Sequence, residues 1–246
     1  MRALLILVAL AAIPEHRAHA IAACAGRSGW GLAEGTVFPP KPRVIYFAPD
    51  WEAESLKKRT PSAAIDGKPV PVKVSWEVIA PDTVAVFAVD SSATGVLEVG
   101  WAADKATGTY ATLGRYTIAA GKDPTEAHGT ISRFHQAYHH STVHEVADGL
   151  RVTVDVTATR FVARVRRDAK SPWQEIPIVA HTADGKSVAQ LGELGCVQNF
   201  SVPILEAGID LELTAELADG AKLPVKGLPA HVVLPPLPPG AEKSSP

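Results

Sequence analysis

Apolar side chains in this chain recur at every second position, and that period is the strongest constraint on its fold. In residues 70–78, valines and Trp76 alternate with Pro71, Lys73, Ser75 and Glu77. The same alternation occurs in residues 150–156 and 209–213. A period of two places one set of side chains in a core and the other in water, as in half-buried antiparallel strands. The pattern therefore predicts an all-β protein.

Turn signals support this interpretation. Asp-Gly suits the positive backbone angles of tight hairpin turns, and it occurs at Asp66-Gly67, Asp148-Gly149, Asp184-Gly185 and Asp219-Gly220. With 20 prolines and 19 glycines, helical turns are expected only at 51–58 and in the histidine-rich segment 135–144. Further strands are expected at 43–47, 83–89, 96–101, 115–119, 160–165 and 176–180.

The N-terminus predicts export. Residues 1–20 combine Arg2, a short apolar run at 4–13 and a small-x-small end at Ala18-His19-Ala20, which is the pattern of a signal peptide. A lipoprotein signal ending at Cys24 is the alternative, although charged residues separate that cysteine from the apolar run. No later apolar run approaches the roughly 20 residues of a transmembrane helix. We expect a periplasmic or secreted protein without a transmembrane segment.

The two cysteines follow from that expectation. In an oxidising compartment Cys24 and Cys196 are expected to form a disulfide, with two separate buried thiols as the alternative. A redox role is not indicated, because the chain has no C-x-x-C motif.

A polar segment with glycine and proline at 120–129 divides the mature chain. We expect an N-terminal β-sandwich domain at 24–120 and a C-terminal one at 129–235, each near the size of an immunoglobulin-like (Ig-like) sandwich. Residues 236–246 are rich in proline and are expected to form a flexible tail.

Two segments resemble exported bacterial proteins with Ig-like domains. The Cys24-Ala25-Gly26 opening and the 38–42 segment are similar to the start of such domains. The 191–196 segment, with Asn199, looks like exported, uncharacterised bacterial proteins of the same two-sandwich kind. The resemblance implies two tandem Ig-like antiparallel β-sandwich domains and an exported location. It implies no activity and no catalytic residue.

A histidine cluster is the main chemical candidate. His135, His139, His140 and His144 lie within ten residues and are weak candidate ligands for zinc or copper. On a helix, the i, i+4 pairs would share a face. On a single strand, His140 and His144 would share one face and His135 would lie with His139 on the other. The alternative is a solvated face, since no H-E-x-x-H motif is present.

Arginines and tryptophans offer weaker signals. Arg160, Arg164 and Arg166 share a strand face, with Arg167 and Lys170 nearby, and a solvated face is the alternative to an anion site. The tryptophans are expected to fill a core or an interface rather than to stack on a sugar. They are Trp30, Trp51, Trp76, Trp101 and Trp173.

These patterns favour an exported, non-catalytic binding or structural module with no resident cofactor. Its partner is expected to be a protein or an envelope component, met through loops or an open sheet edge. Nucleic acid is not expected, because the formal net charge is only −2. Alternatives are a zinc- or copper-binding protein that uses the histidines, and a small hydrolase whose residues converge only in three dimensions.

Overall fold

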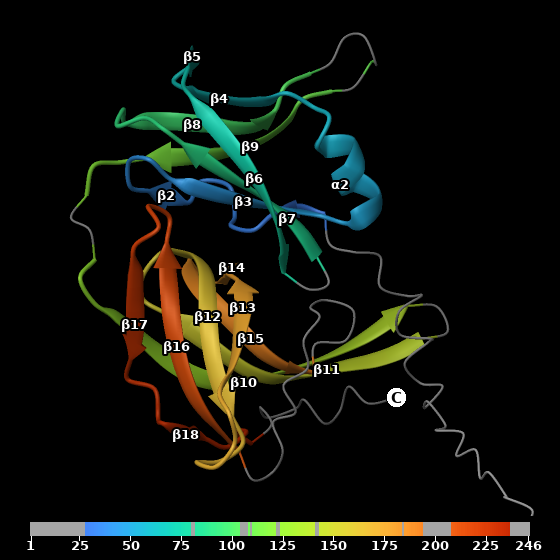
Figure 1. Ribbon diagram of the computed structural model, residues 1–246, viewed down its shortest axis with the longest axis vertical. Helices are drawn as coiled ribbons and strands as arrows, with labels where there is room; N and C mark the ends of the chain where they lie inside the picture. The colour runs from blue at the N-terminus through green and yellow to red at the C-terminus, as the bar shows by residue number, and fades with distance from the viewer. Residues whose placement is uncertain are drawn as a thin grey trace, which may run out of the picture.

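The computed structural model has two β-rich halves joined by the segment between residues 118 and 127 (Figure 1). It describes residues 28–79, 82–103, 108, 110–121, 124–140, 143–183, 185–193 and 208–236. For residues 82, 136–140, 143–147 and 193 it describes the backbone alone. Strands dominate the described chain, so the all-β prediction is confirmed.

The first half contains two sheets. One has the order β1-β3-β7-β6 and the other the order β2-β9-β8-β4-β5. The strands of the first sheet are β1 (Gly29–Trp30), β3 (Arg43–Ala48), β7 (Asp82–Val89) and β6 (Val72–Ile79). Those of the second are β2 (Val37–Phe38), β9 (Thr112–Ile118), β8 (Gly95–Trp101), β4 (Pro61–Ile65) and β5 (Lys68–Pro69).

Aromatic side chains form the centre of this half. Trp101 is only 1% exposed, and its ring lies 4.8 Å from Phe87 and 4.9 Å from Tyr46, measured between centroids. Trp30 and Trp76 pack at the edge of the same cluster. These three tryptophans fill a core, as predicted. Trp51 differs, because it is 74% exposed on the helix.

The helix α2 (Asp50–Leu56) covers part of this half beside β3 and β7. It coincides with the helical turn expected at 51–58. Asp50 and Glu52 lie in its first turn, where negative charge stabilises the helix by interacting favourably with the helix dipole. Ala53 and Leu56 are its buried positions, so one narrow face packs on the sheets.

The second half forms one continuous path of paired strands, in the order β13-β12-β16-β17-β10-β11-β15-β14, with β18 paired to β16. Its long strands are β10 (Ala127–His140), β11 (Val143–Val154), β12 (Ala158–Arg166), β15 (Lys186–Glu193) and β16 (Ile209–Leu217). The shorter ones are β13 (Gln174–Val179), β14 (His181–Ala183), β17 (Lys222–Lys226) and β18 (His231–Val232). Leu150, Val152 and Val154 are fully buried, as their alternation predicts.

One strand order occurs in both halves. The set β1-β3-β7-β6 corresponds to β10-β11-β15-β14, and the set β5-β4-β8-β9 corresponds to β13-β12-β16-β17. In each half an opening strand also makes a short parallel pairing with a strand from the end of that half, β2 with β9 and β10 with β17. These two parallel pairings differ from the purely antiparallel sheets expected from the sequence.

The Asp-Gly turns are confirmed in part. Asp66 and Gly67 both have positive φ, 48° and 74°, and connect β4 to β5 as a two-residue hairpin turn. Asp219-Gly220 lies in the β16–β17 turn, and Gly185 lies in the β14–β15 turn. The turn predicted at Asp148-Gly149 was wrong, because both residues lie inside β11 and pair with β15.

The two halves pack against each other. Ile45, Phe47, Val84 and Val86 of the first half form a buried apolar cluster with Val179 of the second. Close by, the backbone N–H of Arg43 donates to the Ala218 carbonyl across the junction, at 2.5 Å. Apolar contact and a main-chain hydrogen bond therefore both hold the halves together.

Candidate interaction surface

The β10–β11 hairpin is longer than the sheet that carries it. It contains 12 paired positions, from Gly129–Val154 to His140–Val143. On its outer sides, β15 pairs only with residues 148–154 of β11, and β17 pairs only with residues 127–128 of β10. Within the described chain, β10 from 129 to 140 and β11 from 143 to 147 therefore have one strand neighbour each. We call residues 129–140 and 143–148 the arm. Its outer part, 136–140 with 143–147, extends beyond β15 and projects from the second half in Figure 1.

The free edge of β10 presents main-chain groups. The carbonyl of His128 accepts the N–H of Asp155, so the main chain of His128 faces β11. Main-chain groups of an antiparallel strand alternate in direction, and those at 129, 131, 133, 135, 137 and 139 therefore face away from β11. A strand edge with this alternation is a template for another extended segment.

An ion pair fixes the root of the arm. Arg133 of β10 donates to both carboxylate oxygens of Asp148 on β11, from Nε at 2.8 Å and from Nη2. Its Nη1 donates to the Pro235 carbonyl at 3.2 Å, which ties in the end of the described chain. Burial opposes ionisation of Asp148, but the hydrogen bonds and charge of Arg133 outweigh it and hold the pKa of that carboxyl below its ordinary value.

Two facing glycines lie next to the last pair of β11 and β15, at the root of the arm. Gly149 pairs with Gly192 of β15. A Cβ on Gly149 would lie 2.2 Å from the Leu191 carbonyl oxygen, and one on Gly192 would lie 2.6 Å from the Asp148 carbonyl oxygen. Because the two strands approach this closely near the end of their pairing, no side chain fits at either position.

The register places two of the four candidate histidines opposite each other and the other two opposite Asp148 and Val143. His135 pairs with Asp148, His139 with His144, and His140 with Val143. Residues 135–140 and 143–144 belong to the strands β10 and β11, so the helical turn expected in 135–144 was wrong. His140 and His144 lie on different strands, so the single-strand alternative does not apply to them either. Of the four imidazoles, the structure describes that of His135, whose Nδ1 is buried, has no hydrogen-bond partner and lies 3.8 Å from Asp148 Oδ2. Among the described side chains, no three His, Cys, Asp or Glu groups converge as metal ligands.

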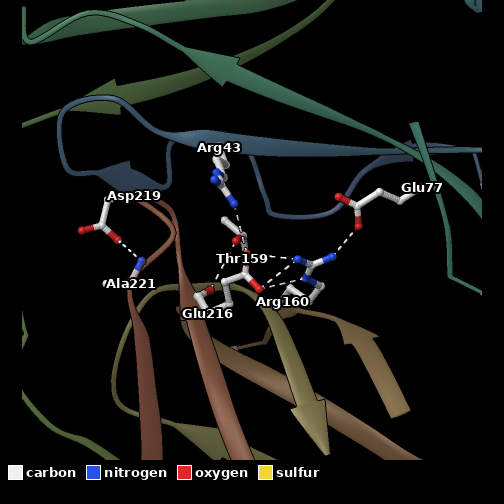
Figure 2. Close-up of polar contacts among 7 residues, drawn as sticks. All are labelled: Arg43, Glu77, Thr159, Arg160, Glu216, Asp219 and Ala221. Atoms are coloured by element: carbon white, nitrogen blue, oxygen red, sulfur yellow. Dashed lines mark hydrogen bonds and ion pairs between the residues drawn. The ribbon is translucent and has the colours of Figure 1, made fainter. Parts of the chain in front are cut away.

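Figure 2 shows a network of charged groups at the junction of the halves. Arg160 of β12 donates to both oxygens of Glu216 on β16, at 2.9 to 3.1 Å, and to Glu77 Oε2 of β6 at 2.5 Å. Arg43 of β3 donates to Glu216 Oε1 at 3.3 Å. The Glu216 side chain is only 5% exposed. Burial lowers the pKa of Arg160, but Glu216 and Glu77 outweigh that effect and raise it. Two ion pairs therefore cross the junction.

The arginine face of β12 is largely neutralised by acids on β16. Arg164 pairs with Glu212, and Arg166 pairs with Asp210. Trp173 lies over both guanidinium groups, with ring centroids 4.9 and 4.5 Å from their central carbons. Three of the arginines singled out in the sequence, Arg160 included, are therefore held in cross-strand ion pairs.

Sequence reasoning missed the acidic partners. Glu216, Asp148 and Glu77 stand at ordinary strand positions, and their partners lie 15 or more residues away. The only available signal was the alternation of acids along 210–216 beside the alternation of arginines along 160–166. Pairing the two strands in register would have matched them.

Other predictions fall outside the described chain. The signal peptide, the proposed lipidation site, both cysteines of the expected disulfide and tail residues 237–246 lie there. Within the described ranges, no helix has the length and apolar character needed to cross a bilayer. Comparison with models of known families, with curated proteins and with solved structures found no match.

Proposed function

We propose that this chain is an exported, non-catalytic binding module that recruits a protein partner by strand addition to the free edge of its arm. The observation that carries the proposal is the outer edge of β10 from residue 129 to 140, which pairs with no strand of the described chain. The described segment after β17 approaches only the start of this edge, at Gly129 and Arg133. Proteins normally cover or shorten such edges, because an open edge pairs with other chains. An edge of this length fits an extended partner segment, which would gain main-chain hydrogen bonds along it.

The repeated strand order supports a framework of two tandem Ig-like β-sandwich domains. An Ig-like domain has the sheets A-B-E-D and C-F-G. Assigning β10, β11, β12, β14, β15, β16 and β17 to strands A to G gives these sheet orders, and the first half matches in the same way. The corresponding opening strands of the first half, β1 and β2, have two residues each. The extra length of β10 and β11 is therefore an addition to the shared framework.

Export is proposed from the first 20 residues, which have the pattern of a signal peptide.

Contacts at the junction and at the root of the arm support a fixed position of the arm. Arg160 bridges Glu216 and Glu77, and Arg133 ties Asp148 to the end of the described chain. A preorganised arm loses less conformational entropy when a partner binds.

Proline at position 137 tests the proposal. The main-chain N–H of Ala137 faces the free edge, and a proline there removes it without removing a β10–β11 hydrogen bond. The protein, exported into its native envelope, would be cross-linked and captured through a tag. We expect Ala137→Pro to lower the amount of specifically cross-linked partner at least about tenfold, because several edge hydrogen bonds are lost together.

Ala137→Val is the matched control, because it keeps the N–H and suits a strand. Hydrogen exchange of the purified complex gives a second readout, with protection expected at alternate amides from 129 to 139. Equal capture by Ala137→Pro and the wild-type protein, at equal thermal stability, would rule out edge pairing.

The metal-binding alternative retains one specific observation. The register places His139 directly opposite His144 across the hairpin. Directly opposite positions in an antiparallel pair have Cβ atoms about 5 Å apart, which is a suitable spacing for two ligands of one cation. Titration with Zn²⁺ and Cu²⁺ of the wild-type protein and of His139→Ala decides this alternative, with His140→Ala as the control.

A further inference from the structure

A small pocket lies at one end of the arginine face in the second half. Its volume is about 210 Å³, and it lies between the end of β12, the 167–173 segment and the starts of β13 and β16. Val165 and Ile209, which are 3% and 2% exposed, supply apolar contacts. The remaining lining residues are Arg166, Arg167, Ser171, Pro172 and Gln174.

The charged groups that line the pocket are cationic. Arg166 and Arg167 are among its described lining residues, whereas Asp and Glu are not. Arg166 pairs with Asp210, whose other oxygen lies 2.9 Å from His231 Nδ1. Arg167 has no acidic partner among the ion pairs of the described residues. Arg167 therefore carries an uncompensated charge at the pocket. Arg160, Arg164 and Arg166 of β12 do not, because each is paired with an acid.

Local hydrogen bonds fix the pocket in shape. Asp168 Oδ1 accepts the main-chain N–H groups of Lys170 and Ser171, at 2.8 and 3.0 Å. These bonds hold the pKa of Asp168 below its ordinary value, and the carboxylate is directed to its own turn. Trp173 restricts Arg166 by stacking on its guanidinium group. Arg166 therefore lies at the end of β12, and Arg167 lies between that strand and a turn that is ordered without a ligand.

We propose that this pocket binds an oxyanion group, a phosphate or a sulfate. Guanidinium groups present several N–H donors in a planar array that matches the oxygens of such an anion. The Gln174 amide adds a neutral donor at the pocket. The volume holds a single such group with its attachment point, so the ligand is either a small phosphorylated or sulfated molecule or the headgroup of an anionic lipid. This site is independent of the arm.

The test is calorimetric titration of the purified mature chain with inorganic phosphate and then sulfate, at fixed ionic strength with chloride as the balancing anion. Arg167→Gln removes the unpaired charge, and Lys170→Gln removes an equal charge from the same segment without removing a lining residue. We expect saturable binding that Arg167→Gln weakens at least about tenfold and Lys170→Gln leaves within about threefold. Absence of saturable binding, or equal weakening by both variants, would overturn the proposal.

Vesicles identify the source of the anion. Co-sedimentation would use phosphatidylcholine vesicles with and without phosphatidylglycerol. Phosphate binding without vesicle binding supports a small soluble ligand, whereas binding to both that depends on Arg167 supports a lipid headgroup. Vesicle binding without phosphate binding contradicts the site, because it reflects general attraction to a charged surface. Circular dichroism of both variants confirms that they are folded.

Discussion

Glu216 and Arg160 form a two-oxygen ion pair between β16 and β12, and Arg160 also reaches Glu77 in the other half. Removing one partner of a buried ion pair leaves the other charge uncompensated. We therefore expect Glu216→Gln to lower the free energy of unfolding by about 3 kcal/mol. Urea unfolding followed by fluorescence measures this loss.

Glu212→Gln is the matched comparison. Glu212 pairs with Arg164 between the same two strands, but the side chains are 55% and 42% exposed. An exposed pair of this kind contributes about 0.5 kcal/mol or less. Similar losses in the two variants would show that burial of Glu216 at the junction has no special energetic effect.

The Arg133–Asp148 pair at the root of the arm predicts a pH-dependent stability. The folded-state pKa of Asp148 is lowered, so its contribution is present above the ordinary carboxyl pKa of about 3.9 and is lost as the pH falls through the folded value. Arg133→Gln removes that contribution, which we expect to be about 2 kcal/mol at pH 7. The difference between the variant and the wild-type protein should shrink below about pH 4.

Urea unfolding at pH 7, 5 and 3 measures this effect. Arg115→Gln is the control, because Arg115 and Glu98 are exposed and their charged atoms lie 3.9 Å apart. If the gap between Arg133→Gln and the wild-type protein is the same at every pH, Asp148 is not the responsible group.

Local patterns predicted the strands but not the partners of those strands. Alternation located β6, β11 and β16, and the two-residue turn at Asp66-Gly67 followed from the preference of Asp-Gly for positive backbone angles, which both residues have. These features depend on near neighbours in the chain, which a sequence shows directly. The all-β class followed for the same reason.

Features that depend on distant residues were missed or wrong. Asp148-Gly149 has the composition of a turn, yet its geometry is decided by Gly192, more than 40 residues later. Between β10 and β11 the sequence is Ser141-Thr142, which has no Gly or Asn as a turn signal. His139 and His144 were consequently not recognised as cross-strand neighbours.

The Gly149–Gly192 pair gives a steric prediction. A Cβ at position 149 meets the Leu191 carbonyl at 2.2 Å, and that main-chain oxygen belongs to a buried strand. Gly149→Ala must therefore displace β15, and we expect a loss of about 2 kcal/mol in unfolding free energy. Gly121→Ala is the control, since a Cβ there meets nothing within 4 Å. Equal stability of the two variants would show that β11 and β15 do not approach at Gly149.

Trp101 and Trp51 differ strongly in burial. Trp101 is 1% exposed and contacts the rings of Phe87 and Tyr46, whereas Trp51 is 74% exposed on α2. Trp101→Ala leaves a cavity at the centre of the first half and should cost about 4 kcal/mol. Trp51→Ala should change stability by less than about 0.5 kcal/mol. Thermal unfolding of both variants measures the contrast, and acrylamide quenching, which should affect Trp51 far more, checks the assignment. A loss of stability in Trp51→Ala comparable to that of Trp101→Ala would mean that the outer face of α2 is covered in solution.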